Sequence, residues 1–216
     1  MTNLVTLVVP RGKIAGLCIA LSLAVGTFPE NTSALADPQS NVRSFYDALL
    51  TTMRNGPTLG QSGRYARLAP VVDRVFDVPS MTRLAIGSSW AALSPAQQQQ
   101  LVEAFRHYIA ATYADRFDSY SGQQLQVTGE RPYNGDVVVQ TKIVKSDGDT
   151  TTLDYLMRQN QGSWQVSDVY FDGTISQVAI QRSEFYSILR RDGVDGLVIA
   201  LNRKVDLLGR GVAKAS

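Results

Sequence analysis

The stretch DVVVQTKIVKSDGDTTTLDYLMRQNQGSWQVSDVYFDG, residues 136–173, decides the fold that we predict for this chain. Apolar and polar residues alternate along it, and β-branched and aromatic residues are frequent, as in half-buried strands. The pairs Asn134-Gly135, Asp147-Gly148 and Gln161-Gly162 accept the positive φ angles of tight turns. The pattern therefore predicts a four-stranded antiparallel meander with strands at 125–130, 136–145, 150–158 and 164–171.

Helical spacing of apolar residues surrounds the meander on both sides. Asp37-Pro38 can start a first helix, and Ser94-Pro95-Ala96-Gln97 is the capping-box pattern that opens a long helix ending before Gly122. The expected helical segments are 38–55, a second stretch that carries Leu68, Val71, Val72, Val75 and Phe76 on one stripe, and then 79–86, 95–121, 176–191 and 195–208. Because helices precede and follow the strands, we predict an α+β fold with helices packed around the four-stranded meander.

The first 36 residues resemble an export signal. Arg11 and Lys13 precede an apolar run at 14–25, and Ala34-Leu35-Ala36 supplies the small-x-small site of a signal peptidase. The run is too short to cross a bilayer as a helix, which needs about 20 residues. We therefore predict a signal peptide at 1–36 and a single domain at 37–216, for which a division into two sub-lobes stays open.

Composition and motifs argue against several classes of protein. The net charge of +2 indicates neither a nucleic-acid surface nor a polybasic membrane anchor. Cys18 lies inside the signal and His107 is the single histidine, so we expect no metal site and no cofactor. We expect His107 on a helix surface or in packing, although a role as general base stays open.

The stretch WQVSDVYFDGTISQ, residues 164–177, is where an enzyme remains conceivable. Strict alternation would place Trp164, Val166, Asp168 and Tyr170 on one strand face. Asp168 with Tyr155 or Tyr170 could serve an isomerase or dehydratase in an apolar pocket, because burial can raise the pKa of a carboxyl group. The alternative interpretation is structural, with Asp172-Gly173 as a turn and Thr174 or Ser176 as a helix cap.

Both faces of the meander carry more apolar residues than a sheet with one solvated face needs. One face must pack on helices, and alternation leaves open which face that is. We predict that the sheet and helices enclose an apolar cavity, although a protein-binding adaptor with an apolar docking face is also consistent with the pattern. The residues predicted to line this cavity and contact lipid are Phe76, Leu84, Phe105, Val137, Val139, Tyr155, Met157, Val169 and Phe171.

Three stretches together resemble a known family. They are VFDVPSMTRLAIGSSWAALSPAQQQQLVEAFRHYIAATYADRF at 75–117, WQVSDVYFDGTIS at 164–176 and RSEFYSILRRDGVDGLVIALNRK at 182–204. In this order they are similar to the MlaC and toluene-tolerance auxiliary family of periplasmic lipid carriers. The sequence after Gly173, in which Thr174-Ile175 precede Ser176, resembles the HpnM-like branch associated with hopanoids. The signature positions, which we expect to be structural, are Phe76, Asp77, Gly87, Trp90, Gly173, Ser176, Arg182 and Phe185.

The resemblance implies a function as well as a fold. The family has a nuclear-transport-factor-like sheet with a deep apolar cavity, and it offers no catalytic residues to carry over. Its members move lipid through the periplasm of Gram-negative bacteria, between an inner-membrane ABC transporter with an MCE protein and an outer-membrane acceptor. The expected ligand here is a hopanoid or a phospholipid, and the expected function is a non-enzymatic carrier that supports outer-membrane lipid asymmetry.

Overall fold

The computed structural model describes residues 37–210, which belong to one compact unit. The predicted signal peptide, with Cys18 and the Ala34–Ala36 cleavage site, lies outside the described residues. Within 37–210, no helix is both long enough and apolar enough to cross a membrane.

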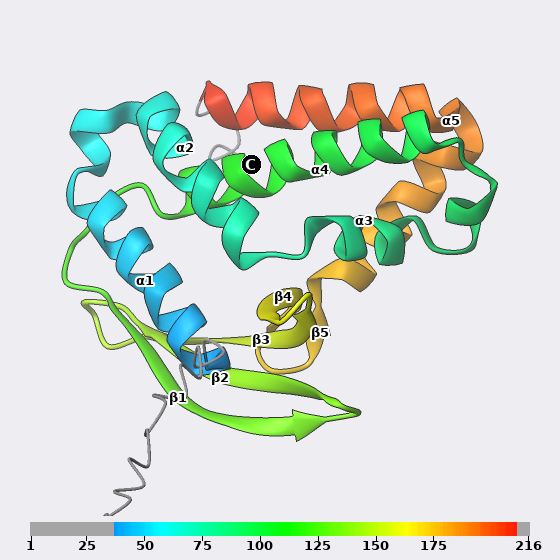
Figure 1. Ribbon diagram of the computed structural model, residues 1–216. Coiled ribbons are helices and arrows are strands. Elements are labelled where there is room, and N and C mark those ends of the chain that lie inside the picture. Colours follow the sequence, from blue (N-terminus) through cyan, green and yellow to red (C-terminus); the bar gives the residue numbers. More distant parts are fainter. Residues whose placement is uncertain (1–36, 211–216) are drawn as a thin grey trace, which may run out of the picture. The chain divides into compact units, whose positions relative to one another are not determined.

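The predicted α+β class is confirmed (Figure 1). Among residues 37–210, four helices and a short 3₁₀ helix precede the strands, and one long helix follows them. In chain order, the described elements are α1 Pro38–Arg54, α2 Gly56–Val75, α3 Val78–Ile86, η1 Gly87–Ala92, α4 Pro95–Arg116, β1 Gln124–Tyr133, β2 Asp136–Val144, β3 Thr150–Asn160, β4 Ser163–Phe171, β5 Ile175–Ser176 and α5 Gln177–Gly209.

The prediction of four strands is wrong, because the described sheet has five in the order β1-β2-β3-β4-β5. The fifth strand has only two residues, with Ile175 paired to Phe171 and Ser176 paired to Tyr170. Asp172 and Gly173, with φ angles of 50° and 70°, form the turn between β4 and β5. Two residues are too short to show an alternating pattern, so the sequence revealed the turn but not the strand after it.

Strict alternation is also wrong in β4. Met157 pairs with Val166, whereas Leu156 pairs with Asp168, so Ser167 is an extra residue in a β-bulge. Val166 therefore lies on the face of Tyr155 and Met157, and Asp168 lies on the other face. This shift places two buried valines, Val166 and Val169, against the helices.

Two helices contain a break at a glycine with positive φ. Pro57 lies in the first turn of α2, so the Gly56-Pro57 pair opens this helix rather than only ending α1, and α2 kinks at Gly60, where φ is 60°. Helix α5 breaks at Gly193, where φ is 69°, which matches the expected division into two helical segments near this position. The capping box of α4 is present as predicted, with Ser94 and Gln97 bonding each other's backbone amides.

The helices cover the face of the sheet that carries Val139, Tyr155 and Met157 (Figure 1). Helix α1 packs on β1, β2 and β4, and α4 packs between α2 and α5. A buried aromatic cluster joins these layers, and its rings meet mostly edge to face at centroid distances such as 5.1 Å for Phe45 and Tyr113. We call Phe45, Tyr46, Phe76, Tyr113 and Tyr155 the aromatic cluster.

Candidate functional site

Two pockets lie between the helices and the sheet and share part of their lining. The large pocket has a volume of about 790 Å³ and the small pocket about 190 Å³. A pocket of the larger size falls in the range of small-molecule sites. Six residues line both pockets and form what we call the shared wall: Tyr108, Thr112, Arg116, Phe117, Leu153 and Phe171.

Helix α4 forms one side of the shared wall. Tyr108, Thr112 and Arg116 recur every four residues, so they lie on one stripe of the helix. Thr112 donates its hydroxyl to the carbonyl oxygen of Tyr108 at 2.8 Å, which satisfies this polar group within the helix. The stripe therefore offers the pockets mainly carbon atoms, with the guanidinium of Arg116 at its end.

The sheet forms the opposite side. Leu153 of β3 pairs directly with Phe171 of β4, and Leu125 of β1 pairs with Ile143 of β2. All four line the large pocket. The last turns of α5 complete it with Lys204, Leu207 and Leu208.

The structure separates the nine predicted lipid-contact residues into three groups. Phe76, Phe105 and Val169 line the small pocket, and Phe171 lines both pockets. Val139, Tyr155 and Met157 are fully buried in the core, and Val137 is partly buried beside it, but none of these four lines either pocket. Leu84 on α3 is 41% exposed and also lines neither pocket. Lipid contact by each of the nine stays a prediction.

Several lining residues were not among those predicted. The stripe of Tyr108 and Thr112 could have been found from the period of α4, since both belong to its apolar positions. Arg116 interrupts that pattern, and a charged residue is normally assigned to solvent. Leu207 and Leu208 come from the far end of the chain, and only the fold brings them to the sheet.

Charged groups of both signs line the large pocket. Lys204 forms an ion pair with Glu184, and its ammonium lies 5.2 Å from the ring centre of Tyr108. Lys145 lies 3.6 Å from a carboxylate oxygen of Asp149. The remaining charged lining residues are Asp115, Arg116 and Asp118.

Asp168, the candidate base of the enzyme hypothesis, caps a helix. Its Oδ1 accepts the backbone N–H of Val178 at 3.1 Å, and its Oδ2 accepts the hydroxyl of Ser176 at 2.6 Å. Ser176 in turn accepts the backbone N–H of Ala179 and is the N-cap of α5, as one of the sequence alternatives predicted. The carboxylate is thus engaged with donors of a helix N-terminus. Neither Asp168 nor its proposed partners Tyr155 and Tyr170 line the large or the small pocket.

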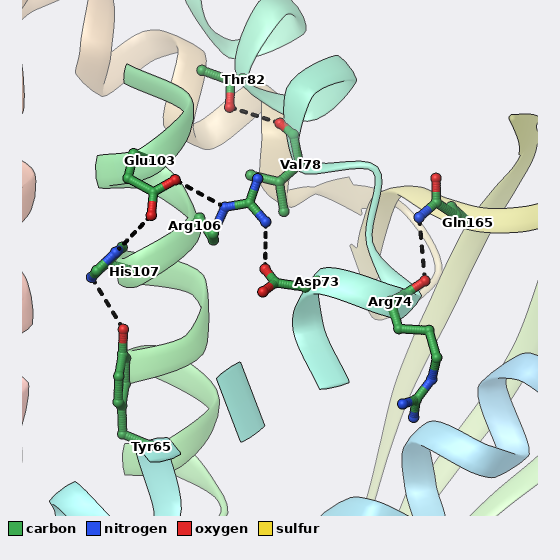
Figure 2. A network of polar contacts seen from close by, with 9 residues as sticks. All are labelled: Tyr65, Asp73, Arg74, Val78, Thr82, Glu103, Arg106, His107 and Gln165. Carbon is green, nitrogen blue, oxygen red and sulfur yellow. Dashed lines mark hydrogen bonds and ion pairs between the residues drawn. The ribbon is translucent and has the colours of Figure 1, made fainter. Parts of the chain in front are cut away.

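His107 belongs to a polar network that joins α2 to α4 (Figure 2). Its ring nitrogens contact the Tyr65 hydroxyl and a Glu103 carboxylate oxygen, each at 3.1 Å. Arg106 bonds Asp73 at 2.5 Å and lies 3.3 Å from Glu103. The network lines neither the large nor the small pocket, whereas Glu103 and His107 line a separate hollow of about 400 Å³ between α4 and α5. His107 is exposed on α4, as expected for a helix-surface position. Across residues 37–210, no group of three or more His, Cys, Asp or Glu side chains could hold a metal ion.

The signature positions make local structural contacts. Asp77 caps α3 by accepting the backbone N–H of Ser80 at 3.1 Å. Gly87 has a φ of 68°, and a Cβ atom there would lie only 2.9 Å from Nε of Arg182, so this glycine leaves room for the guanidinium. The buried ring of Phe185 meets Phe105 edge to face at 5.4 Å.

Comparison with known proteins agrees with these features. The structure is similar to that of a phospholipid-binding protein from Ralstonia solanacearum, solved in complex with a phospholipid, with a TM-score of 0.67 and 28% sequence identity. The match covers 80% of this chain and 99% of that protein. The family described as MlaC protein matches residues 43–203. The chain therefore belongs to the MlaC family.

Proposed function

We propose that this protein is a non-enzymatic, lipid-binding carrier that acts in the periplasm. It takes up a hydrophobic lipid, a hopanoid or a phospholipid, and shuttles it between the inner and outer membranes. It serves as the exported component of an ABC-type, Mla-like transport system, with an inner-membrane transporter and MCE protein on one side and an outer-membrane acceptor on the other. Family membership and the phospholipid bound to the Ralstonia protein support this proposal.

The observation that carries the proposal is the pair of pockets joined by the shared wall. Aromatic and aliphatic side chains supply most of this wall, and the small pocket extends from it toward Phe76 and Phe105. Each methylene kept from water contributes roughly 0.8 kcal/mol, so an acyl chain of about 16 carbons exposed to water costs on the order of 13 kcal/mol. An apolar cavity removes most of this barrier and needs no nucleophile, base or cofactor.

Native mass spectrometry of protein purified from membrane-containing cells tests lipid binding. The wild-type protein should carry copurified lipid, and the added mass identifies the ligand. Leu153→Trp places a larger side chain in the shared wall and thereby narrows both pockets, so most of the copurified lipid should be lost. Leu84→Trp is the matched control, because Leu84 is exposed and lines neither pocket, so its lipid should remain.

Carrier activity needs a second measurement. Protein added between donor vesicles containing a fluorescent phospholipid and unlabelled acceptor vesicles should speed lipid transfer in proportion to its concentration. Wild-type protein that carries no lipid and transfers none would reject the carrier and favour the adaptor. Equal lipid occupancy in the Leu153→Trp and Leu84→Trp proteins would reject the two pockets as the binding site.

A further inference from the structure

Arg116 differs from the other cations of the pocket lining. Lys145 and Lys204 line only the large pocket, and each is paired with a carboxylate. Arg116 lines both pockets, and its guanidinium makes no hydrogen bond or ion pair with any residue from 37 to 210. It is thus an available cation at the place where the two apolar pockets meet.

Arg116 is exposed on α4, and its charge acts on the neighbouring Tyr113. Burial raises the pKa of Tyr113, and the charge of Arg116 acts in the opposite direction, so the guanidinium influences an aromatic residue of the small pocket. Asp115 and Asp118 line the large pocket but not the small one. An anion at the shared wall would therefore meet the guanidinium of Arg116, whereas the nearby carboxylate of Asp115 would disfavour a second negative charge.

We propose that Arg116 binds the phosphate group of a phospholipid whose acyl chains occupy the two pockets, and that it selects a phosphodiester lipid over a neutral one. The inference rests on the proposed function and narrows its ligand from a hopanoid or a phospholipid to a phospholipid. A neutral hopanoid offers no anion to Arg116. A guanidinium presents a planar fork of N–H donors that matches two phosphate oxygens at once. A phosphodiester carries a single negative charge, which one guanidinium can match.

Equilibrium displacement of a fluorescent diacylglycerol from delipidated protein tests the proposal. The competitors are phosphatidylglycerol and unlabelled diacylglycerol with the same acyl chains, which differ by the phosphate headgroup. Wild-type protein should bind phosphatidylglycerol about tenfold more tightly than diacylglycerol. Arg116→Gln should lose most of this preference, because its affinity for phosphatidylglycerol should fall much further than its affinity for diacylglycerol. Arg116→Lys keeps the positive charge but not the planar arrangement of N–H donors, so it should retain part of the preference.

Arg83→Gln is the matched control. Arg83 is exposed on α3 and lines neither pocket, so this variant removes the same charge and should keep the wild-type preference. Inorganic phosphate alone, at the concentration of the competing lipid, should leave the fluorescent lipid bound. If phosphate displaced it, the site would be one for the free anion, and the proposal would be overturned.

The failure of this inference can be told apart from the failure of the proposed function. Equal affinity of the wild-type protein for the two lipids, or a full preference in Arg116→Gln, would overturn the role of Arg116 and leave a lipid carrier. Failure of wild-type protein to bind the fluorescent diacylglycerol and phosphatidylglycerol would reject the carrier itself.

Discussion

On the helix-covered face of the sheet, one half is covered by closely packed side chains and the other half lines the two pockets. We call them the filled half and the hollow half. In the filled half, Tyr155 is fully buried, with ring centres of Phe45 and Tyr46 at 6.2 and 5.9 Å. In the hollow half, Leu153 and Phe171 face the two pockets, and Phe171 is 39% exposed. Leu153 and Tyr155 are two residues apart on the same strand and face.

The difference between the halves comes from the helices. Helix α1 packs the rings of Phe45 and Tyr46 against Tyr155 at the centre of the sheet, so this part of the face is covered. Over Leu153 and Phe171, the covering residues are the Tyr108–Thr112 stripe of α4 and the last leucines of α5, which leave a hollow. A strand pattern therefore shows that a sheet is rich in apolar residues, while the helices that cover it decide whether an apolar region becomes core or binding site.

Truncating one aromatic residue in each half should give the largest contrast. Phe45→Ala removes a ring from the filled half and should lower the free energy of unfolding by about 3–5 kcal/mol, because a cavity remains. Phe171→Ala should cost about 1 kcal/mol, because this side chain is already partly exposed. Urea unfolding at 25 °C measures both values. Similar losses in the two variants would contradict the distinction between filled and hollow halves.

Three tyrosines should also make the protein sensitive to alkali. Burial raises the pKa values of Tyr46 and Tyr155 in the filled half, and of Tyr113 beside the small pocket, above 10, their ordinary value. Below pH 10 the three hydroxyls are protonated in both folded and unfolded chains, so stability is unaffected. Above pH 10 only the unfolded chain releases these protons, so stability should fall by up to about 4 kcal/mol per pH unit, or about 1.4 for each tyrosine.

Urea unfolding at pH 9, 10 and 11 measures this slope. In a Tyr113→Phe variant, the decrease in stability above pH 10 should be smaller by about 1.4 kcal/mol per pH unit, which is the contribution of one tyrosine. A free energy of unfolding that stayed constant from pH 10 to 11 would show that these hydroxyls ionise as readily in the folded protein as in the unfolded chain.

Substitution of Asp168 should have a smaller effect on stability, and it distinguishes a structural role of this residue from a catalytic one. Asp168→Asn weakens the contacts with Ser176 and Val178 at the start of α5 and should lower stability by about 1–3 kcal/mol. Copurified lipid should be unchanged, because Asp168 lines neither pocket. Asp172→Asn, in the adjoining turn with a φ of 50°, is the control and should be nearly neutral, since Asn tolerates that conformation. Turnover of a small substrate that disappears in Asp168→Asn would instead favour the enzyme.

The sequence predicted most of the fold because local signals were strong. Both residues of Asn134-Gly135 and Gln161-Gly162 have positive φ angles at their hairpin turns, as expected, whereas in the Asp147-Gly148 pair only Gly148 does. The bulge at Ser167 was not predicted, since an extra residue in one strand is visible only from the register of its partner.

The candidate site was harder to predict than the fold. Val139, Tyr155 and Met157 have the same apolar character as Leu153, but only their helical neighbours place them in the core. Arg116 could not be chosen from its type, since its significance comes from its place at the junction of two pockets. Sequence periodicity identifies apolar surface, and the arrangement of the covering side chains identifies unfilled space.

The smallest expected effect concerns the Tyr155 hydroxyl, which is buried beside the Tyr46 and Tyr113 hydroxyls but makes no well-formed hydrogen bond among residues 37–210. Tyr155→Phe removes this group without changing the ring, so stability should stay constant or rise by up to about 1 kcal/mol. Tyr46→Phe is the matched comparison, because the Tyr46 hydroxyl contacts Thr141 Oγ1 at 2.5 Å. Its loss should cost about 1 kcal/mol. A substantial loss of stability in Tyr155→Phe would contradict this expectation and would mean that the Tyr155 hydroxyl bonds the neighbouring Tyr46 or Tyr113 hydroxyl after all.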